Sequence, residues 1–220
     1  MSLPLPQLQV VPGRCFAALT APYRLVVPDL QIDHTVPTSF RCFDGASLPR
    51  WARPLLDVHP FSRGAQVASL VHDQLYQVPS ARHARGLNGW GRRRKPVDEL
   101  FWELLLRGGL APAKAWIKFK AVRVGGKPAW QRPQEGPRAC DPDATAPCPR
   151  PRRSVGGRRA LVALLDPPGA LKQHLQDDLD GLRQAGLGRA VEPPRVAEVA
   201  ELLRAAAGLP DDPDDPAGLA

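Results

Sequence analysis

Residues 64–78 constrain the fold most, because their apolar side chains repeat at the spacing of an α-helix. The repeat consists of four aliphatic residues: Val67, Val71, Leu75 and Val78. Pro79 ends it, since proline cannot continue a helix. Pro96 then suits the first turn of a second helix, which ends at Gly108. The sequence therefore predicts two helices that are joined by a loop and pack in antiparallel orientation.

Short strands are expected before these two helices, and a third helix after them. Residues 16–19, 23–27 and 30–32 are brief apolar or alternating runs that prolines separate. Proline in such short runs favours a small hairpin layer over a large sheet. A short helix is predicted at residues 47–57 and a longer one at residues 111–123. The fold class that follows is a mostly helical α+β domain with a short N-terminal β layer.

The domain boundaries follow from where this periodicity is lost. Residues 1–130 are expected to form the α+β core, and residues 131–159, rich in Pro and Arg, a flexible linker. The chain has 26 Pro and 19 Gly, which gather in its second half and support this division. Helical patterns return over residues 160–208, which predicts a small helical appendage. Residues 209–220 carry four Asp and are expected to be an acidic, disordered tail.

The charge and the apolar content narrow the possible partners. The net charge is +8, and such a basic surface attracts the phosphates of nucleic acid or of anionic lipid. The sequence has no run of 18 apolar residues, so no transmembrane helix is expected. The N-terminus lacks the charged-then-apolar layout of a signal peptide. The four cysteines have no zinc-finger spacing, so free thiols are expected, with a Cys140–Cys148 disulfide as the alternative.

Four polar residues on the two central helices form a candidate catalytic site. His72 and Tyr76 are four residues apart and share one face of the first helix. Asp73 is rotated by about 100° from His72 and can reach a neighbouring loop. Asp98 lies on the apolar side of the second helix, where a carboxylate is costly unless it is paired. The sequence therefore predicts that His72 and Tyr76 meet Asp98 between the helices.

Such a pairing has a defined chemistry. A histidine that a carboxylate holds in one tautomer can take a proton from water. A hard cation bound by Asp73 and by backbone carbonyls would polarise an ester carbonyl and stabilise the oxyanion. Residues 43–49 are the candidate carbonyl loop, in which Gly45 permits a tight turn. Each residue alone also fits a core, cap or turn position, so the hypothesis depends on their joint occurrence.

These residues carry two resemblances. His72-Asp73-x-x-Tyr76 followed by Asp98-x-x-Phe101 resembles the active-site pattern of the phospholipase A2 superfamily, especially its disulfide-poor viral and bacterial branches. The segment Asp44-Gly45-x-Ser47 resembles the calcium-loop stretch of bacterial members. Over residues 16–130 the chain also resembles an uncharacterised phage- and prophage-encoded family. The marks of that family are Asp-x-x-Ser-x-Pro (Asp44 to Pro49), His-Asp-x-Leu-Tyr (His72 to Tyr76), a later Asp with Phe, and Trp130.

The resemblance implies a role for each residue. His72 would be the general base, Asp98 its orienting partner, and Tyr76 a hydrogen-bond donor to Asp98. Calcium would be the cofactor, and its ligands would be Asp73 and carbonyls near Asp44, Gly45 and Ala46. The implied function is that of a phage-encoded lipid-ester hydrolase in the host cytoplasm or the virion. A non-catalytic phage structural or assembly protein, with the His-Asp-Tyr network as a staple, is the alternative.

The loop between the two helices is a candidate contact surface. Its aromatic and basic residues are Trp90, Arg92, Arg93, Arg94 and Lys95. An exposed tryptophan beside cations suits an anionic lipid surface or a phage structural protein, and a solvated loop is the plain alternative. Nucleic acid is a less favoured partner. His59 with His72, Asp73 and Asp98 also fits a loose metal phosphohydrolase pattern, which Pro60 weakens by breaking the required helix.

Overall fold

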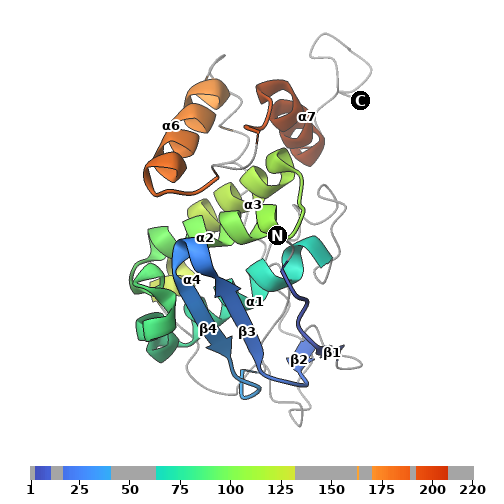
Figure 1. Cartoon of the computed structure of the whole chain (residues 1–220). Helices are drawn as coiled ribbons and strands as arrows, with labels where there is room; N and C mark the ends of the chain where they lie inside the picture. Colours follow the sequence, from blue (N-terminus) through green and yellow to red (C-terminus); the bar gives the residue numbers. More distant parts are fainter. Residues whose placement is uncertain are drawn as a thin grey trace.

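The computed structural model describes residues 3–10, 17–40, 63–131, 163, 170–188 and 192–207. Within these residues the protein is a mostly helical α+β structure with a small N-terminal β layer, which confirms the predicted class (Figure 1). The strands are β1 (Leu8–Val10), β2 (Ala17–Leu19), β3 (Tyr23–Val27) and β4 (Ile32–Val36). The α-helices are α1 (Arg63–Gln77), α2 (Arg94–Arg107), α3 (Pro112–Gly125), α4 (Lys127–Gln131), α6 (Ala170–Gln184) and α7 (Val196–Ala207).

The β layer consists of two antiparallel pairs, β1 with β2 and β3 with β4. Buried and exposed residues alternate along β3 and β4, as expected for a hairpin with one face on the core. The predicted run at residues 30–32 is mostly not a strand. Pro28–Leu30 forms a short 3-10 helix, η1, and Gln31 adopts a left-handed conformation before β4 begins. The strand β1 was not predicted, because three residues are too few to show a periodicity.

The helix α1 lies at the centre of the core domain. Every residue from 67 to 76 is buried, so the helix is enclosed on all sides and not on one apolar face alone. It packs antiparallel to α2, since Gly64 at its start lies against Gly108, just beyond the end of α2. A Cβ on Gly108 would come within 2.3 Å of the Gly64 carbonyl oxygen. The two backbones can touch there only because residue 108 has no side chain.

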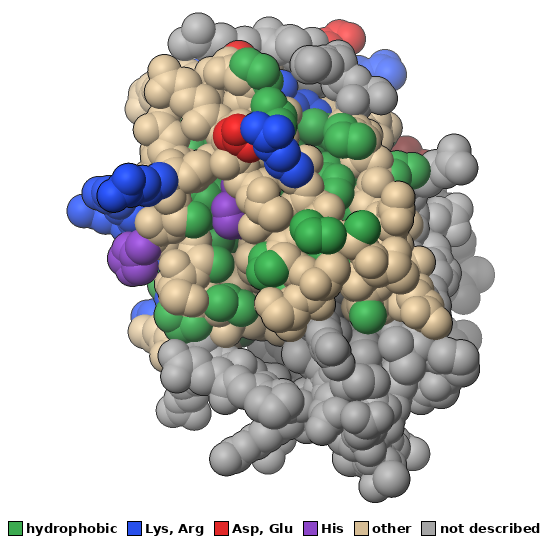
Figure 2. Space-filling view, turned by 60° about the horizontal axis from the view of Figure 1, so that its bottom comes forward, with side chains coloured by type: hydrophobic (Ala, Val, Ile, Leu, Met, Phe, Trp, Pro, Cys, Tyr) green, Lys and Arg blue, Asp and Glu red, His purple; other side chains and the backbone are tan. Residues whose placement is uncertain are grey.

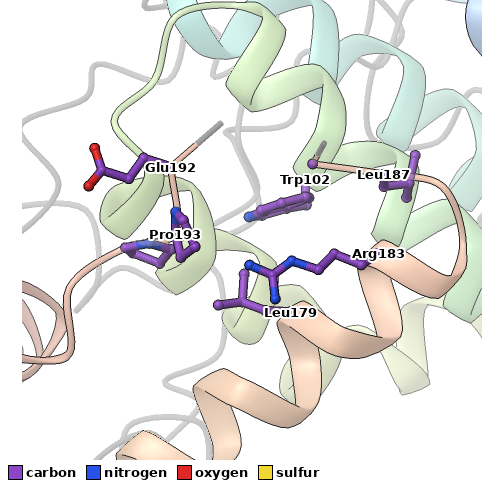
Figure 3. Close-up of a pocket in the computed structure, with 8 residues that line it drawn as sticks. Trp102, Leu179, Arg183, Leu187, Glu192 and Pro193 are labelled. Carbon is purple, nitrogen blue, oxygen red and sulfur yellow. The ribbon is translucent and has the colours of Figure 1, made fainter. Parts of the chain in front are cut away.

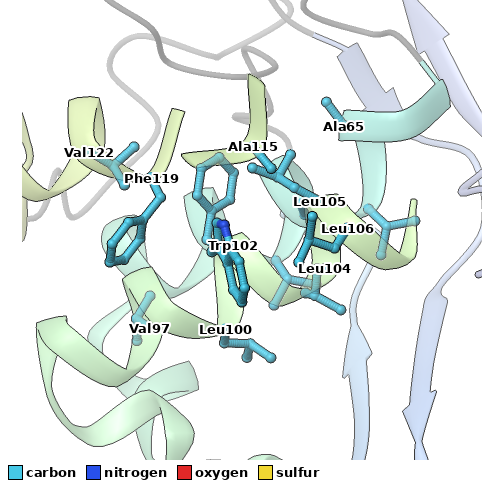
Figure 4. Close-up of a cluster of buried hydrophobic side chains, with 14 of the residues drawn as sticks. Ala65, Val97, Leu100, Trp102, Leu104, Leu105, Leu106, Ala115, Phe119 and Val122 are labelled. Atoms are coloured by element: carbon cyan, nitrogen blue, oxygen red, sulfur yellow. The ribbon is translucent and has the colours of Figure 1, made fainter. Parts of the chain in front are cut away.

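The next layer is α3, which packs on α2. Apolar side chains of both helices interlock there, among them Val97 and Trp102 of α2 and Ala115, Phe119 and Val122 of α3 (Figure 4). This buried cluster fixes the direction of α2 and so places its polar residues against α1. The segment between α1 and α2 was expected to be a loop. It contains three short 3-10 helices: η4 (Pro79–His83), η5 (Arg85–Leu87) and η6 (Trp90–Arg92).

The appendage helices α6 and α7 lie at the end of the molecule away from the strands (Figure 1). Asp178 of α6 accepts a hydrogen bond from the Trp116 indole at 3.0 Å and forms an ion pair with Lys120 at 2.7 Å. The Gly188 N–H donates to Glu103 of α2 at 2.8 Å. The appendage is therefore docked on the core through polar contacts to α2 and α3. The helix at 47–57, the linker beyond residue 131, the tail and all four cysteines lie outside the described residues.

Candidate active site

His72, Tyr76 and Asp98 meet between α1 and α2. The His72 Nε2 atom lies 3.1 Å from Asp98 Oδ1, and the Tyr76 hydroxyl donates to the same oxygen at 2.6 Å. The His72 ring also stacks on Tyr76, with 4.1 Å between centroids, and packs against Phe101 at 4.6 Å. Two aromatic neighbours and one carboxylate thus fix the orientation of the imidazole.

Two arginines complete the surroundings of Asp98. Arg123 of α3 donates to Asp98 Oδ2 at 2.8 Å, and Arg94, one turn before Asp98 on α2, lies 3.5 Å from the same oxygen. Arg94 also donates to the carbonyl of Arg123 at 2.8 Å, which ties the end of α3 to the start of α2. The Asp98 carboxylate therefore receives donors from three helices. We call His72, Tyr76, Arg94, Asp98 and Arg123 the Asp98 network.

The electrostatics favour an ionised Asp98 beside a histidine that protonates readily. Burial alone would raise the pKa of Asp98, but hydrogen bonds from His72, Tyr76 and Arg123 hold it below its ordinary value. Burial likewise opposes protonation of His72, but the carboxylates of Asp73 and Asp98 outweigh it and raise the pKa of the ring. Burial, together with the negative charge of Asp98, raises the pKa of Tyr76, so this hydroxyl stays a donor.

The second ring nitrogen of His72 lies on the side of Asp73. Nδ1 is 4.0 Å from Asp73 Oδ1, which is beyond direct hydrogen-bond range but close enough for one polar atom to contact both. Asp73 is buried, and its carboxylate is a hard oxygen donor of the type that calcium prefers. No group of three or more His, Cys, Asp or Glu side chains among the described residues could hold a metal ion. The other expected ligands, at Asp44, Gly45 and Ala46, lie outside the described residues.

A second layer of residues supports Tyr76 from behind. Arg82 donates to the carbonyls of Leu75 and Tyr76 at 2.7 and 2.9 Å, so a cation occupies the negative end of α1. Its guanidinium lies 3.6 Å above the ring of Trp130, whose edge meets Tyr76 at 5.2 Å between centroids. A Cβ on Gly126 would come within 2.7 Å of the Tyr76 hydroxyl. The junction of α3 and α4 therefore packs directly on this hydroxyl.

The residues of the predicted contact surface do not all face solvent in the structure. Arg92, Arg93 and Lys95 are exposed, and Figure 2 shows Lys and Arg side chains projecting from one edge of the molecule. Arg94 instead turns inward to Asp98, because a residue four positions away on the same helix is its nearest anion. Trp90 is not the exposed anchor expected from sequence. It is half-buried, with its indole N–H 3.4 Å from the Leu30 carbonyl oxygen.

Sequence reasoning missed Arg123 and the inward role of Arg94. The spacing of Arg94 and Asp98, four residues apart on one helix, was a signal that could have identified the pair. Arg123 had no local signal, because its partner lies 25 positions away in the chain on another helix. Arg82 and Trp130 also support the site. Trp130 belongs to the motifs of the resembled family, but no signal in the sequence indicated that Arg82 would lie over its ring.

The fold and the site define a helical α+β domain whose two central helices share a buried His-Asp-Tyr network. Residues 18–122 match the model of a family described as a protein of unknown function (DUF1353), so this part of the chain is a DUF1353 domain. The match includes all members of the Asp98 network except Arg123 and leaves the appendage outside. No curated protein and no solved structure gives a significant match to the chain.

Proposed function

We propose that the protein hydrolyses a lipid ester with a water molecule that His72 activates. The observation that carries the proposal is the hydrogen bond between His72 Nε2 and Asp98 Oδ1 at 3.1 Å, which leaves Nδ1 on the side of Asp73. In this arrangement Nδ1 takes a proton from water while the hydroxide attacks the ester carbonyl. Asp98 stabilises the imidazolium that forms. The proton then passes to the leaving alcohol, so the base is regenerated.

Calcium is the cofactor that we propose for this reaction. Asp73 would hold it together with backbone carbonyls at residues 44–46, and the ion would stabilise the negative charge on the carbonyl oxygen. The donor type of Asp73 and its position beside His72 Nδ1 support this assignment. Removal of calcium with a chelator is therefore expected to abolish hydrolysis.

The proposed substrate surface is an anionic lipid layer. The exposed residues Arg92, Arg93 and Lys95 supply positive charge on the segment that joins α1 to α2. Among the described residues, none of the helices has the length and apolar character needed to cross a bilayer. The phage-type motifs of the sequence lead us to propose a phage or prophage origin, with action in the host cytoplasm or the virion.

The test is the release of fatty acid from vesicles that contain anionic phospholipid, in the presence of calcium. We expect the wild-type protein to release fatty acid and His72→Gln to lose at least about a hundredfold in rate, because general base catalysis is lost. His174→Gln is the matched control, since His174 is exposed on α6, and it should keep full activity. Circular dichroism should show both variants folded. A wild-type protein that releases no fatty acid would exclude the proposal.

The two buried histidines should titrate on opposite sides of the ordinary pKa of 6.5. The negative charges around His72 raise its pKa despite burial, whereas burial lowers the pKa of His34, whose Nε2 meets the neutral Gln74 amide oxygen at 2.8 Å. A general base works when neutral, so the hydrolysis rate should rise with pH along the His72 titration, above pH 6.5. NMR titration of the ring protons measures both values. The reverse order would contradict the assignment of His72 as the charge-paired base.

A second candidate function is favoured by the burial of the same network. Asp98 is 0% exposed and has four donors, and His72 is 6% exposed. A fully satisfied polar network can specify how helices pack without catalysing a reaction. In this case the protein would be a phage structural or assembly component. Asp98 variants would then lose stability, while no ester would be cleaved by the wild-type protein.

A further inference from the structure

The pocket between α2 and the appendage is too small for an organic ligand. It is bordered by Trp102, Leu179 and Pro193 (Figure 3) and has room for about one water molecule. Among the described residues, Arg94 and Arg123 are better suited to bind a ligand, because both side chains reach the surface. The proposed hydrolysis gives these two arginines no role beyond their contact with the network.

The two arginines come from different helices and converge on one oxygen atom. Arg94 of α2 and Arg123 of α3 place their Nη1 atoms 3.5 and 2.8 Å from Asp98 Oδ2. They meet because the end of α3 lies beside the start of α2, where Arg94 donates to the Arg123 carbonyl at 2.8 Å. Figure 4 shows Val122 of α3 and Val97 of α2 at the same end of the apolar cluster. The two guanidinium groups are therefore close enough for one phosphate group to contact both.

Both guanidinium groups retain donors that Asp98 does not use. The Asp98 side chain is 0% exposed, whereas those of Arg94 and Arg123 are 20% and 27% exposed, which places the arginines on the solvent side of the carboxylate. Their hydrogen bonds to Asp98 and to backbone carbonyls all use Nη1. The Nε and Nη2 atoms have no acceptor among the described residues, and none of them is a buried unpaired atom, so they are open to water.

The positive charge at this place exceeds the negative charge of the described residues around it. Asp98 is the carboxylate that pairs with both Arg94 and Arg123. Glu99, which follows it on α2, is buried and lies 3.6 Å from a further cation, Lys95. Arg94 and Lys95 also stand in the first turn of α2, which has no acidic residue, although the positive end of a helix dipole disfavours cations. An anion at the free donors would offset this excess.

We infer that Arg94 and Arg123 bind a phosphate group at the surface between α2 and α3. Each guanidinium donates to Asp98 through Nη1 and to phosphate oxygens through Nε and Nη2, which form a planar fork. A phosphate can place different oxygen atoms on the two forks, whereas a carboxylate presents only one edge with two oxygens. A phospholipid headgroup and a free phosphate ion share this chemistry. The site requires no ester hydrolysis, so it does not depend on the proposed function.

Titration of the full chain with sodium phosphate tests the site, with the ionic strength held constant by sodium chloride. The readout is the Nε–H resonances of Arg94 and Arg123, which Arg94→Lys and Arg123→Lys assign by removing them. We expect saturable shifts at millimolar phosphate and none with chloride alone. Arg123→Gln should weaken binding about tenfold, as read from the Arg94 signal, because charge-assisted hydrogen bonds are lost. Lys172→Gln removes an exposed cation on α6 and is the matched control, with unchanged affinity.

Co-sedimentation with phosphatidylglycerol vesicles identifies the source of the phosphate. If the ligand is a lipid headgroup, the wild-type protein should bind the vesicles and Arg123→Gln should bind them about tenfold more weakly. If vesicle binding is equal in the two proteins while free phosphate still shifts the resonances, the ligand is a free phosphate ion. Both results support a phosphate site at the arginine pair.

Two results would overturn the site. The first is the absence of a saturable shift of either resonance at millimolar phosphate. The second is unchanged phosphate affinity in Arg123→Gln, in which Asp98 keeps its contact with Arg94. If circular dichroism shows Arg123→Gln unfolded, Arg123→Lys takes its place. It keeps the positive charge beside Asp98 but lacks the planar fork, so phosphate binding should still weaken, and unchanged affinity would equally exclude the site.

Discussion

Replacement of Asp98 by alanine should lower the free energy of unfolding by about 3–5 kcal/mol, because it removes a fully buried carboxylate that four donors share. Asp98 is 0% exposed and accepts from His72, Tyr76, Arg94 and Arg123. Without it, the two guanidinium groups lie side by side with no anion between them. The Tyr76 hydroxyl also loses its acceptor at 2.6 Å. A buried donor without a partner retains its full desolvation penalty.

Asp33→Ala provides the matched control for this experiment. Asp33 makes two hydrogen bonds to Arg24, at 2.7 and 2.5 Å, but both side chains are exposed on the β3–β4 hairpin. Water replaces the lost partner there, so the stability should hardly change. Urea unfolding followed by circular dichroism measures both variants. If Asp98→Ala is no more destabilising than Asp33→Ala, the Asp98 network does not hold the helices together.

The central pair of helices could be predicted because its signals are local. Apolar spacing and two prolines give α1 to within one residue at each end, and the start of α2 to within two residues. The pairing of His72 with Asp98 could also be predicted from the types and positions of the two residues. A carboxylate on an apolar helix face needs a partner, and a histidine on the neighbouring helix is the obvious one. The structure places these two groups 3.1 Å apart.

Features that depend on distant parts of the chain could not be predicted. Arg123 reaches Asp98 only because α3 packs across the start of α2, and sequence periodicity does not give that crossing. Trp90 looked like an exposed anchor beside cations, yet the loop folds back so that its indole lies near Leu30. The docking of the appendage by Asp178 and Gly188 also had no signal in the sequence. Side-chain environment is a tertiary property, and local composition indicates it poorly.

Lys118 is the clearest case of a residue whose environment contradicts its type. Lysines ordinarily face solvent, but Lys118 of α3 is 0% exposed and its Nζ atom has no hydrogen-bond partner among the described residues. Burial lowers its pKa from 10.5 to about 8. The folded protein therefore carries the cost of burying an ammonium at neutral pH. Replacement of Lys118 by an apolar residue of similar length should therefore stabilise the protein.

Lys118→Met should raise the free energy of unfolding at pH 7 by about 3 kcal/mol, at about 1.4 kcal/mol for each pH unit between the two pKa values. The sign follows from proton binding. Between about pH 8 and pH 10.5 the unfolded chain holds the lysine proton and the folded protein has released it, so wild-type stability rises with pH. The advantage of Lys118→Met should therefore shrink across this range. Chemical denaturation at a series of pH values measures it.

Lys120→Met on the same helix should have the opposite effect. Lys120 pairs with Asp178 at 2.7 Å, so its removal breaks a contact that docks α6 on the core. The two substitutions are chemically identical, since each replaces an ammonium group with a thioether. Only the surroundings of the two positions differ. A stabilising Lys118→Met beside a destabilising Lys120→Met would show that burial without a partner sets the sign. A stability difference for Lys118→Met that does not change with pH would mean that the Lys118 amine remains charged and solvated in the folded protein.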